Sequence, residues 1–328
     1  MDMELSLCPK GRKGQLWKDF LARAGLEADM NVERTALLWD GEALIATGSR
    51  QGNLLKCIAV DESRQGEGLT ATVLTALRQD AFEAGHSHLF LYTKPKNKWM
   101  FSSLFFYPVA QTADVLLMEN RRGGIRDFLE TLPAEPCEGT VGAAVMNCNP
   151  FTKGHRYLIE TAARECDLLY VFVLSEDRSH FSAADRLEMV KQGTADLPNV
   201  RVLPTGPYLI SSATFPTYFL KEREKAGVIQ CRLDIEIFKN YFVPKFGIKR
   251  RYVGTEPLSP MTNLYNQALQ AYLPEAGIEL REIPRTELDG NPVSASAVRA
   301  LLEAGDLTAL RELVPQTTWD YLNQHHLL

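Results

Sequence analysis

The stretch from residue 145 to residue 155, VMNCNPFTKGH, combines residue types that can bind a nucleoside triphosphate. An apolar run leads into a loop with proline and glycine, and a helix is expected to begin near His155. The start of a helix presents unpaired backbone N–H groups and the positive end of the helix dipole, and both attract phosphate. A docked triphosphate would meet Thr152, Gly154 and His155, because glycine lets a backbone approach closely and an imidazole can donate a hydrogen bond. A strand–loop–helix turn with a capping histidine is the alternative interpretation.

A second stretch with phosphate-binding chemistry is VSASAVR, residues 293–299, directly before an apolar helix. The hydroxyls of Ser294 and Ser296 and the guanidinium of Arg299 can hold β- and γ-phosphates at a helix start. Taken alone, the stretch is better explained by a capping serine and a solvated arginine. Because it occurs together with the first stretch and after it, the pair indicates a nucleotide site.

Two further positions are weaker candidates for the same site. The run VGTE, residues 253–256, ends an apolar strand with Gly254 and Glu256, which would face a nucleotide or lie in a solvated loop. Arg186, in FSAADRLEMV, could contact phosphate, although arginines on helix surfaces are common. Neither position decides the function alone.

Strands and helices alternate from Thr140 onward, and these elements must position the candidate residues. The alternation is typical of an α/β fold, in which helices cover both faces of a parallel sheet. Ligands of such sheets bind at the carboxyl ends of the strands. The predicted strands are 140–147, 168–175, 199–206, 249–256 and 278–285, and the predicted helices are 154–165, 186–195, 215–227, 293–305 and 307–314.

The first 120 residues have a different pattern, that of a smaller α+β module. Its predicted elements are strands within 33–61, a helix at 69–85, and strands at 88–94 and 113–120. Arginine, glycine and proline then become frequent around a short helical piece. We therefore expect one domain at 1–120, a connection at 121–139 and a second domain at 140–328.

Composition excludes several classes of protein. The chain has 328 residues, of which 45% are hydrophobic and 23% charged, as in ordinary globular proteins. Its net charge of -5 argues against nucleic-acid binding, and no apolar run approaches the length of a signal peptide or a membrane span. The six cysteines are scattered without metal-like clustering, so we expect a cytoplasmic protein with free thiols.

Three motifs resemble those of known families. Thr152-Lys153-Gly154-His155 matches the T/HxGH motif of the nucleotidyltransferase superfamily at all four places, which implies a Rossmann-like domain. VSASAVR resembles that superfamily's ISSTxxR signature, with departures at Val293 and Ala295. The loop from Ser63 to Gly68 resembles the Q/RxxGxG/A loop of GNAT acetyltransferases, which binds acyl-CoA pyrophosphate, but Ser63 departs from that pattern.

A GNAT-like module followed by a nucleotidyltransferase-type domain is a distinctive combination. Together with NPFTKGHRYLIE, SSATFPTYFLK and YVGTEP, it makes the chain resemble the citrate lyase ligase family over nearly its whole length. The resemblance implies that ATP activates acetate as acetyl-AMP. The acetyl group then passes to the thiol of a dephospho-CoA-derived group on the acyl carrier subunit of citrate lyase, with release of AMP and pyrophosphate. The N-terminal module would hold the CoA-like arm of that carrier.

The resemblance also implies roles for individual residues and cofactors. Mg²⁺ is expected with ATP, held mostly by phosphates and water, so no metal ligand is assigned within the chain. No nucleophile–base pair is needed, because the carboxylate of acetate attacks the α-phosphate itself. The expected catalytic residues are Thr152, Lys153 and His155. The expected nucleotide-binding residues are Asn149, Pro150, Phe151, Gly154, Arg186, Gly254, Glu256, Ser294, Ser296 and Arg299.

Two other functions share these motifs. An adenylyltransferase that acts on a phosphopantetheine or mononucleotide substrate would carry the same TxGH and serine–arginine stretches. An acetyltransferase with a nucleotide-sensing second domain is the other alternative, and the departure at Ser63 disfavours it. A product containing AMP joined to a second nucleotide would indicate the first, and acetyl-CoA turnover without ATP the second.

Overall fold

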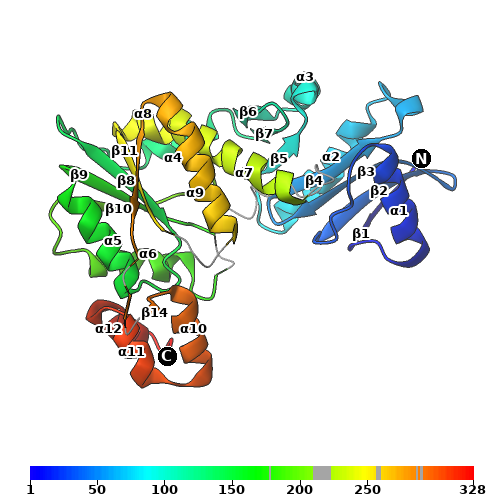
Figure 1. The fold of residues 1–328 in the computed structure, drawn as a ribbon. Helices are drawn as coiled ribbons and strands as arrows, with labels where there is room; N and C mark the ends of the chain where they lie inside the picture. Colours follow the sequence, from blue (N-terminus) through cyan, green and yellow to red (C-terminus); the bar gives the residue numbers. More distant parts are fainter. Residues whose placement is uncertain (177–178, 210–222, 256–259, 286, 289–290) are drawn as a thin grey trace. The chain divides into compact units, whose positions relative to one another are not determined.

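The computed structural model describes the chain from residue 1 to residue 328 except residues 177–178, 210–222, 256–259, 286 and 289–290 (Figure 1). The chain forms two compact units. The N-terminal unit comprises residues 1–125 and most of helix α7 (Arg223–Ile237), and the C-terminal unit comprises residues 126–212 and 237–328. Among the described residues, no helix combines the length and apolar character of a membrane span.

The N-terminal unit is built on a seven-stranded sheet. Its strands in spatial order are β1 (Asp2–Ser6), β2 (Arg34–Asp40), β3 (Ala43–Gln51), β4 (Leu54–Val60), β5 (Phe90–Thr93), β7 (Leu116–Glu119) and β6 (Tyr107–Gln111). Strands β4 and β5 are parallel and are joined through helix α2 (Leu69–Glu83), whereas the other neighbours are antiparallel. The paired residues of β4 and β5 are Leu54–Phe90 and Leu55–Leu91, so pairing stops well before β4 ends.

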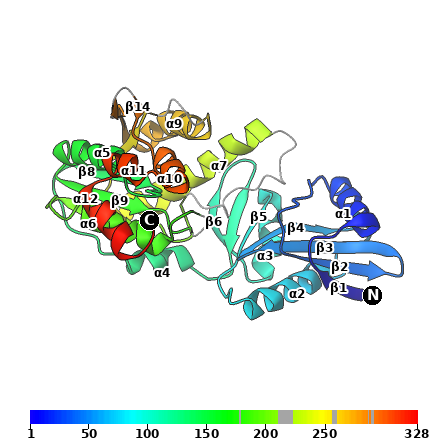
Figure 2. The same cartoon turned by 90° about the horizontal axis from the view of Figure 1, so that it is seen from below.

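Helices cover both faces of this sheet (Figure 2). The indole Nε1 of Trp17, on α1 (Gly11–Arg23), donates to Thr47 Oγ1 at 3.1 Å. The next residue of β3, Gly48, lies against Val73 and Leu77 of α2. Successive strand residues point to opposite faces, so the two helices lie on opposite sides. The sequence predicted strands β2 to β5, β7 and helix α2, and did not predict β1, α1 or β6.

The C-terminal unit contains a five-stranded sheet in which all strands are parallel. Their spatial order is β10 (Val200–Pro204), β9 (Leu168–Val173), β8 (Val141–Met146), β11 (Arg250–Gly254) and β12 (Glu279–Ile283). The first strand, β8, lies in the middle, and the chain later crosses it to add β11 on its other side. This α/β architecture, predicted from the sequence, has a topological switch point between β8 and β11.

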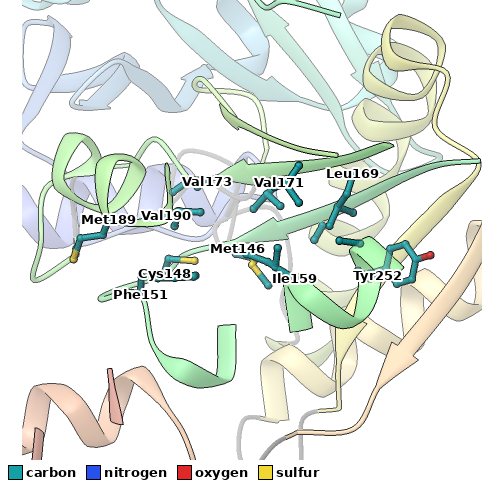
Figure 3. Close-up of a cluster of buried hydrophobic side chains, with 14 of the residues drawn as sticks. Met146, Cys148, Phe151, Ile159, Leu169, Val171, Val173, Met189, Val190 and Tyr252 are labelled. Atoms are coloured by element: carbon teal, nitrogen blue, oxygen red, sulfur yellow. The ribbon is translucent and has the colours of Figure 1, made fainter. Parts of the chain in front are cut away.

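Helices cover both faces of this sheet too, as predicted. On one face α5 (Lys153–Arg164) and α6 (Ala183–Gly193) pack over Leu169, Val171 and Val173 of β9 (Figure 3). The alternate residues Tyr170 and Phe172 point to the opposite face. There they contact aromatic rings of the π-helical turn Phe238–Phe242 and of α8 (Val243–Phe246). Strands buried on both faces explain the continuous apolar runs in the sequence.

The remaining helices and short strands lie in both units. Helices α10 (Ala295–Ala304), α11 (Leu307–Leu313) and α12 (Gln316–Gln324) follow the last parallel strand, and the first two share a small core around Val298, Leu310 and Val314. Helix α4 (Gly124–Glu130) lies in the predicted connection. The others are α3 (Lys98–Ser103), α9 (Pro260–Tyr272), β13 (Glu287–Leu288) and β14 (Asn291–Pro292).

Candidate functional site

A cavity of about 510 Å³ lies in the C-terminal unit where β8, β11 and β12 end and where α10 begins. This is the switch point of the sheet, because the next strand after β8 and the next strand after β11 lie on opposite sides of it. Six predicted site residues line the cavity: Thr152, Gly154, His155, Gly254, Ser294 and Ser296. The structure therefore brings the two predicted phosphate-binding stretches, which are about 140 residues apart, to the same cavity.

Thr152 and His155 hold each other in place at the start of α5. The hydroxyl oxygen of Thr152 accepts from the backbone N–H of His155 at 3.3 Å, and the backbone N–H of Thr152 donates to His155 Nδ1 at 3.1 Å. This reciprocal pair is a capping box, in which a histidine takes the place usually held by glutamate. Because Nδ1 accepts a hydrogen bond, the proton of the neutral imidazole must sit on Nε2.

The environment of His155 also sets its charge. Burial and, secondarily, the positive charge of Arg285 lower the pKa of His155 to about 4. The ring is therefore neutral at pH 7 in the protein without ligand. His155 can donate a hydrogen bond from Nε2 to a phosphate oxygen, while the positive charge beside it comes from Arg285.

Arg285 is a cavity residue that the sequence analysis missed. It lies two residues after the end of β12, and its backbone N–H donates to Thr255 Oγ1 at 3.1 Å while its Nε donates to Thr255 O at 2.8 Å. The side chain is half-buried and lines the cavity. The signal was available, because residues 278–285 were predicted as a strand and ligands bind at strand ends.

Asn266, on α9, is a second missed residue. Its side-chain N–H donates to the carbonyl of Gly254 at 3.0 Å, and the residue is buried in the wall of the cavity. This contact braces the end of β11, where Gly254 was predicted to face the nucleotide. Nothing in the local sequence distinguished Asn266 from other helix residues.

Gly154 is required by a close approach between the two stretches. A Cβ atom placed on Gly154 would lie 2.8 Å from the carbonyl oxygen of Val293, a distance that real Cβ contacts do not reach. The sequence predicts that Gly154 allows a phosphate to approach the backbone closely. The structure adds a second reason, since Gly154 lets the backbone before α10 lie against the start of α5.

A Gly154→Ala change should therefore push the two stretches apart. We expect kcat/KM for ATP to fall at least about tenfold, because displacing a binding group by even 1 Å can cost about 100-fold. The measurement is the ATP dependence of the reaction proposed below, alongside thermal unfolding to establish that the unit stays folded. A folded variant with wild-type ATP kinetics would contradict this account of Gly154.

Arg299 links the two stretches through its hydrogen bonds. Its Nη1 donates to the carbonyl of Asn149 at 2.6 Å and its Nη2 donates to Ser296 Oγ at 3.1 Å. Asn149 in turn accepts from the backbone N–H of Phe181 at 3.0 Å through its side-chain oxygen. In this conformation Arg299 and Asn149 fix the walls of the cavity, and neither belongs to its lining of described residues.

Three other residues of the TxGH region lie outside that lining as well. Pro150 and Phe151 are buried, and the ring of Phe151 stacks beside His155 with 6.0 Å between centroids. Phe151 also occupies the space that a side chain at Gly193 would need. Lys153 is exposed as the first residue of α5.

Arg186 is fully buried beneath the loop that carries these residues. Its guanidinium donates to the carbonyls of Phe181 at 3.1 Å, Asn147 at 3.0 Å and Leu174 at 2.8 Å, and also to the carbonyl of Glu176. These bonds tie the ends of β8 and β9 together. Arg186 was predicted to contact phosphate, and the structure places it behind the cavity wall instead.

Some predicted positions are outside the described residues. Glu256 is one of them, and the whole of SSATFPTYFLK, residues 211–221, is another. Among the residues that the structure does describe, no group of three or more His, Cys, Asp or Glu side chains could hold a metal ion.

A second cavity, of about 550 Å³, lies within the N-terminal unit. It opens where β4 and β5 stop pairing, and Val60 and Tyr92 line it from the two strands. Gly66 and Gly68 of the predicted GNAT-like loop also line it, with positive φ angles of 91° and 76° that favour glycine. The loop predicted to bind a CoA-like group therefore lies at a cavity.

The C-terminal unit is therefore an α/β domain with a cavity at the switch point of its parallel sheet. A family model described as "Citrate lyase ligase C-terminal domain" matches residues 141–322. Proteins named [citrate [pro-3S]-lyase] ligase are similar over most of the chain. The Klebsiella pneumoniae protein is 42% identical, with 93% of this chain and 91% of that protein covered. For the Haemophilus influenzae protein the identity is 36%, and the coverage is 95% and 96%. The chain belongs to the citrate lyase ligase family and is a ligase.

Solved structures show more distant likenesses. Thermotoga maritima TmcAL bound with alpha-thio ATP matches 56% of this chain and 55% of its own, at 14% identity and a TM-score of 0.36. The pantoate-beta-alanine ligase of Francisella tularensis matches 53% and 70%, at 16% identity and a TM-score of 0.35. An acyl-CoA N-acyltransferase from Pseudomonas aeruginosa matches 37% and 100%, at 9% identity and a TM-score of 0.32.

Proposed function

We propose that the protein uses ATP to activate acetate and then acetylates the acyl carrier subunit of citrate lyase. In the first step a carboxylate oxygen of acetate forms a bond to the α-phosphorus of ATP, and pyrophosphate leaves. In the second step the carrier thiol, after losing its proton, attacks the acetyl carbonyl, and AMP leaves. Family membership supports the overall reaction, and the observation that carries the proposal is one cavity lined by both phosphate-type stretches.

The cavity residues would act by positioning phosphates and by offsetting their charge. Ser294 caps α10 and Thr152 caps α5, so two helix N-termini face the same space. The Nε2–H of His155 would donate to a phosphate oxygen whose negative charge grows as pyrophosphate departs. Arg285 would provide the compensating positive charge. No general base is required for the first step, since acetate is already ionised at pH 7.

ATP implies Mg²⁺, and the donor set of the cavity determines how the ion would be held. The described lining has hydroxyl, amide, imidazole and guanidinium groups and no carboxylate. Phosphate oxygens and water would therefore be the principal ligands of Mg²⁺, which would supply further positive charge near the phosphates.

Acetate-dependent pyrophosphate exchange tests the first step. The full chain is incubated with ATP, Mg²⁺ and labelled pyrophosphate, with and without acetate, and label entering ATP is followed. We expect exchange that requires acetate. If exchange is absent, and AMP is also absent after the thiol form of citrate lyase is added, the proposal is wrong. A dinucleotide-type product from a phosphopantetheine or mononucleotide acceptor would then establish the adenylyltransferase alternative.

We assign a different task to the N-terminal domain, proposed as residues 1–120, and place catalysis in residues 140–328. The second cavity supports the proposal that this domain holds the CoA-like arm of the carrier. Titration of the full chain with dephospho-CoA, without ATP, should give saturable binding.

We also propose a cytoplasmic location, supported by six free cysteines.

A further inference from the structure

Helix α3 and the residues around it expose large apolar side chains on the N-terminal unit. Trp99 is 82% exposed, Phe105 is 66% exposed and Met100 is 41% exposed, all within seven residues of chain. Single exposed apolar residues are ordinary, but a cluster of this kind commonly marks an interaction surface. We call residues 94–105 the α3 face.

The backbone at Phe105 makes this exposure more informative. Phe105 follows the end of α3 with a φ angle of +63°, and its N–H donates to Ser102 O while that of Phe106 donates to Phe101 O. Glycine is the usual residue at such a helix end, because any side chain there crowds the backbone and is energetically unfavourable. A mostly exposed ring recovers little of that cost by packing within the N-terminal unit. The side chain of Phe105 is therefore better explained by a contact outside this unit.

The α3 face is also basic. Lys94, Lys96 and Lys98 lie in it, whereas residues 94–105 include no aspartate or glutamate. The chain as a whole has a net charge of -5, so this segment is positively charged although the whole chain is negatively charged. Aromatic anchors surrounded by basic side chains suit an acidic protein surface.

The inner side of the same segment borders the second cavity. Lys94, Met100 and Leu104 line that cavity together with Gly66 and Thr70 of the loop and α2. A partner that consists of a protein surface and a narrow flexible arm could thus bind the α3 face with its surface and the neighbouring cavity with its arm. An acyl carrier with a CoA-like arm has these two parts.

We propose that the α3 face docks the acidic protein surface of the thiol-bearing carrier subunit. This inference rests on the proposed function, since it concerns that reaction's protein substrate. Docking raises the effective concentration of the thiol near the enzyme and leaves the first chemical step unchanged. The effect of the face is therefore confined to kinetics in which the carrier takes part.

The Trp99→Ser/Phe105→Gly double variant tests the apolar part of the face. We expect its KM for the carrier to rise at least tenfold while acetate-dependent pyrophosphate exchange stays at the wild-type rate. Phe105→Gly should not destabilise the unit, because glycine relieves the positive φ angle. Phe82→Ser, at an exposed ring on α2, is the matched control and should leave the KM unchanged.

Lys98→Glu tests the charge. We expect kcat/KM for the carrier to fall at least fivefold at low ionic strength, and the difference from wild type to shrink as salt is added. Lys18→Glu, an exposed change on α1, is the control. An unchanged KM in both α3 variants would overturn the docking proposal. So would self-association of the wild-type chain that the Trp99→Ser/Phe105→Gly variant abolishes, with carrier kinetics unaffected. If the wild-type protein showed no acetate-dependent pyrophosphate exchange, that result would count against the proposed function and not against the docking proposal.

Discussion

A His155→Asn variant should catalyse acetate-dependent pyrophosphate exchange about 100- to 1,000-fold more slowly than the wild type. The side-chain oxygen of asparagine lies near the position of Nδ1 and can still accept from the backbone N–H of Thr152. It places no donor where Nε2–H lies. The variant therefore removes the proposed phosphate contact and keeps the helix cap, so its thermal unfolding should remain close to that of the wild type.

His155→Gln is the complementary variant. Glutamine is a usual capping-box residue at this position, so its amide oxygen can accept from the backbone N–H of Thr152, and its amide N–H can reach toward the Nε2 position. We expect stability close to that of the wild type and a smaller loss of exchange rate than in His155→Asn, because a donor toward the phosphate is retained. If His155→Asn retained near-normal exchange, His155 would have no part in the chemistry.

Replacing Arg186 by methionine should destabilise the C-terminal unit by about 3–5 kcal/mol. The change leaves the carbonyls of Asn147, Leu174 and Phe181 without the charged donor that binds them in a buried site. Each orphaned buried acceptor costs about 1–3 kcal/mol, reduced where water can enter. Urea unfolding followed by circular dichroism measures the effect as an earlier transition.

Arg164→Ala is the control for that experiment. Arg164 is an exposed residue on α5, with only a 3.8 Å ion pair to Glu160, so its loss should change stability by less than about 0.5 kcal/mol. An Arg186→Met variant with wild-type unfolding but a higher KM for ATP would instead support the phosphate contact predicted from the sequence. The unfolding result thus decides between the two roles of Arg186.

Local patterns in the sequence determined much about this protein. Apolar runs separated by amphipathic runs predicted every strand of the C-terminal sheet, because both faces of those strands are buried and each helix has one buried side. The TxGH stretch and the serine–arginine stretch predicted a nucleotide site from neighbouring residues at strand ends and helix starts, and the structure brings both stretches to one cavity. The resemblance to the citrate lyase ligase family, which rested on those stretches, is confirmed by the family match.

Only the tertiary structure decided which of the candidate side chains face the cavity. Arg186 and Arg299 looked alike in the sequence as possible phosphate ligands, but each binds backbone carbonyls of segments far away in the chain. The closeness of Gly154 to Val293 and the place of Arg285 beside His155 also depend on such segments. Periodicity and capping patterns extend over a few residues, whereas these contacts depend on the strand order. That order is selected by packing of the whole sheet, in which a later strand is placed beside the first.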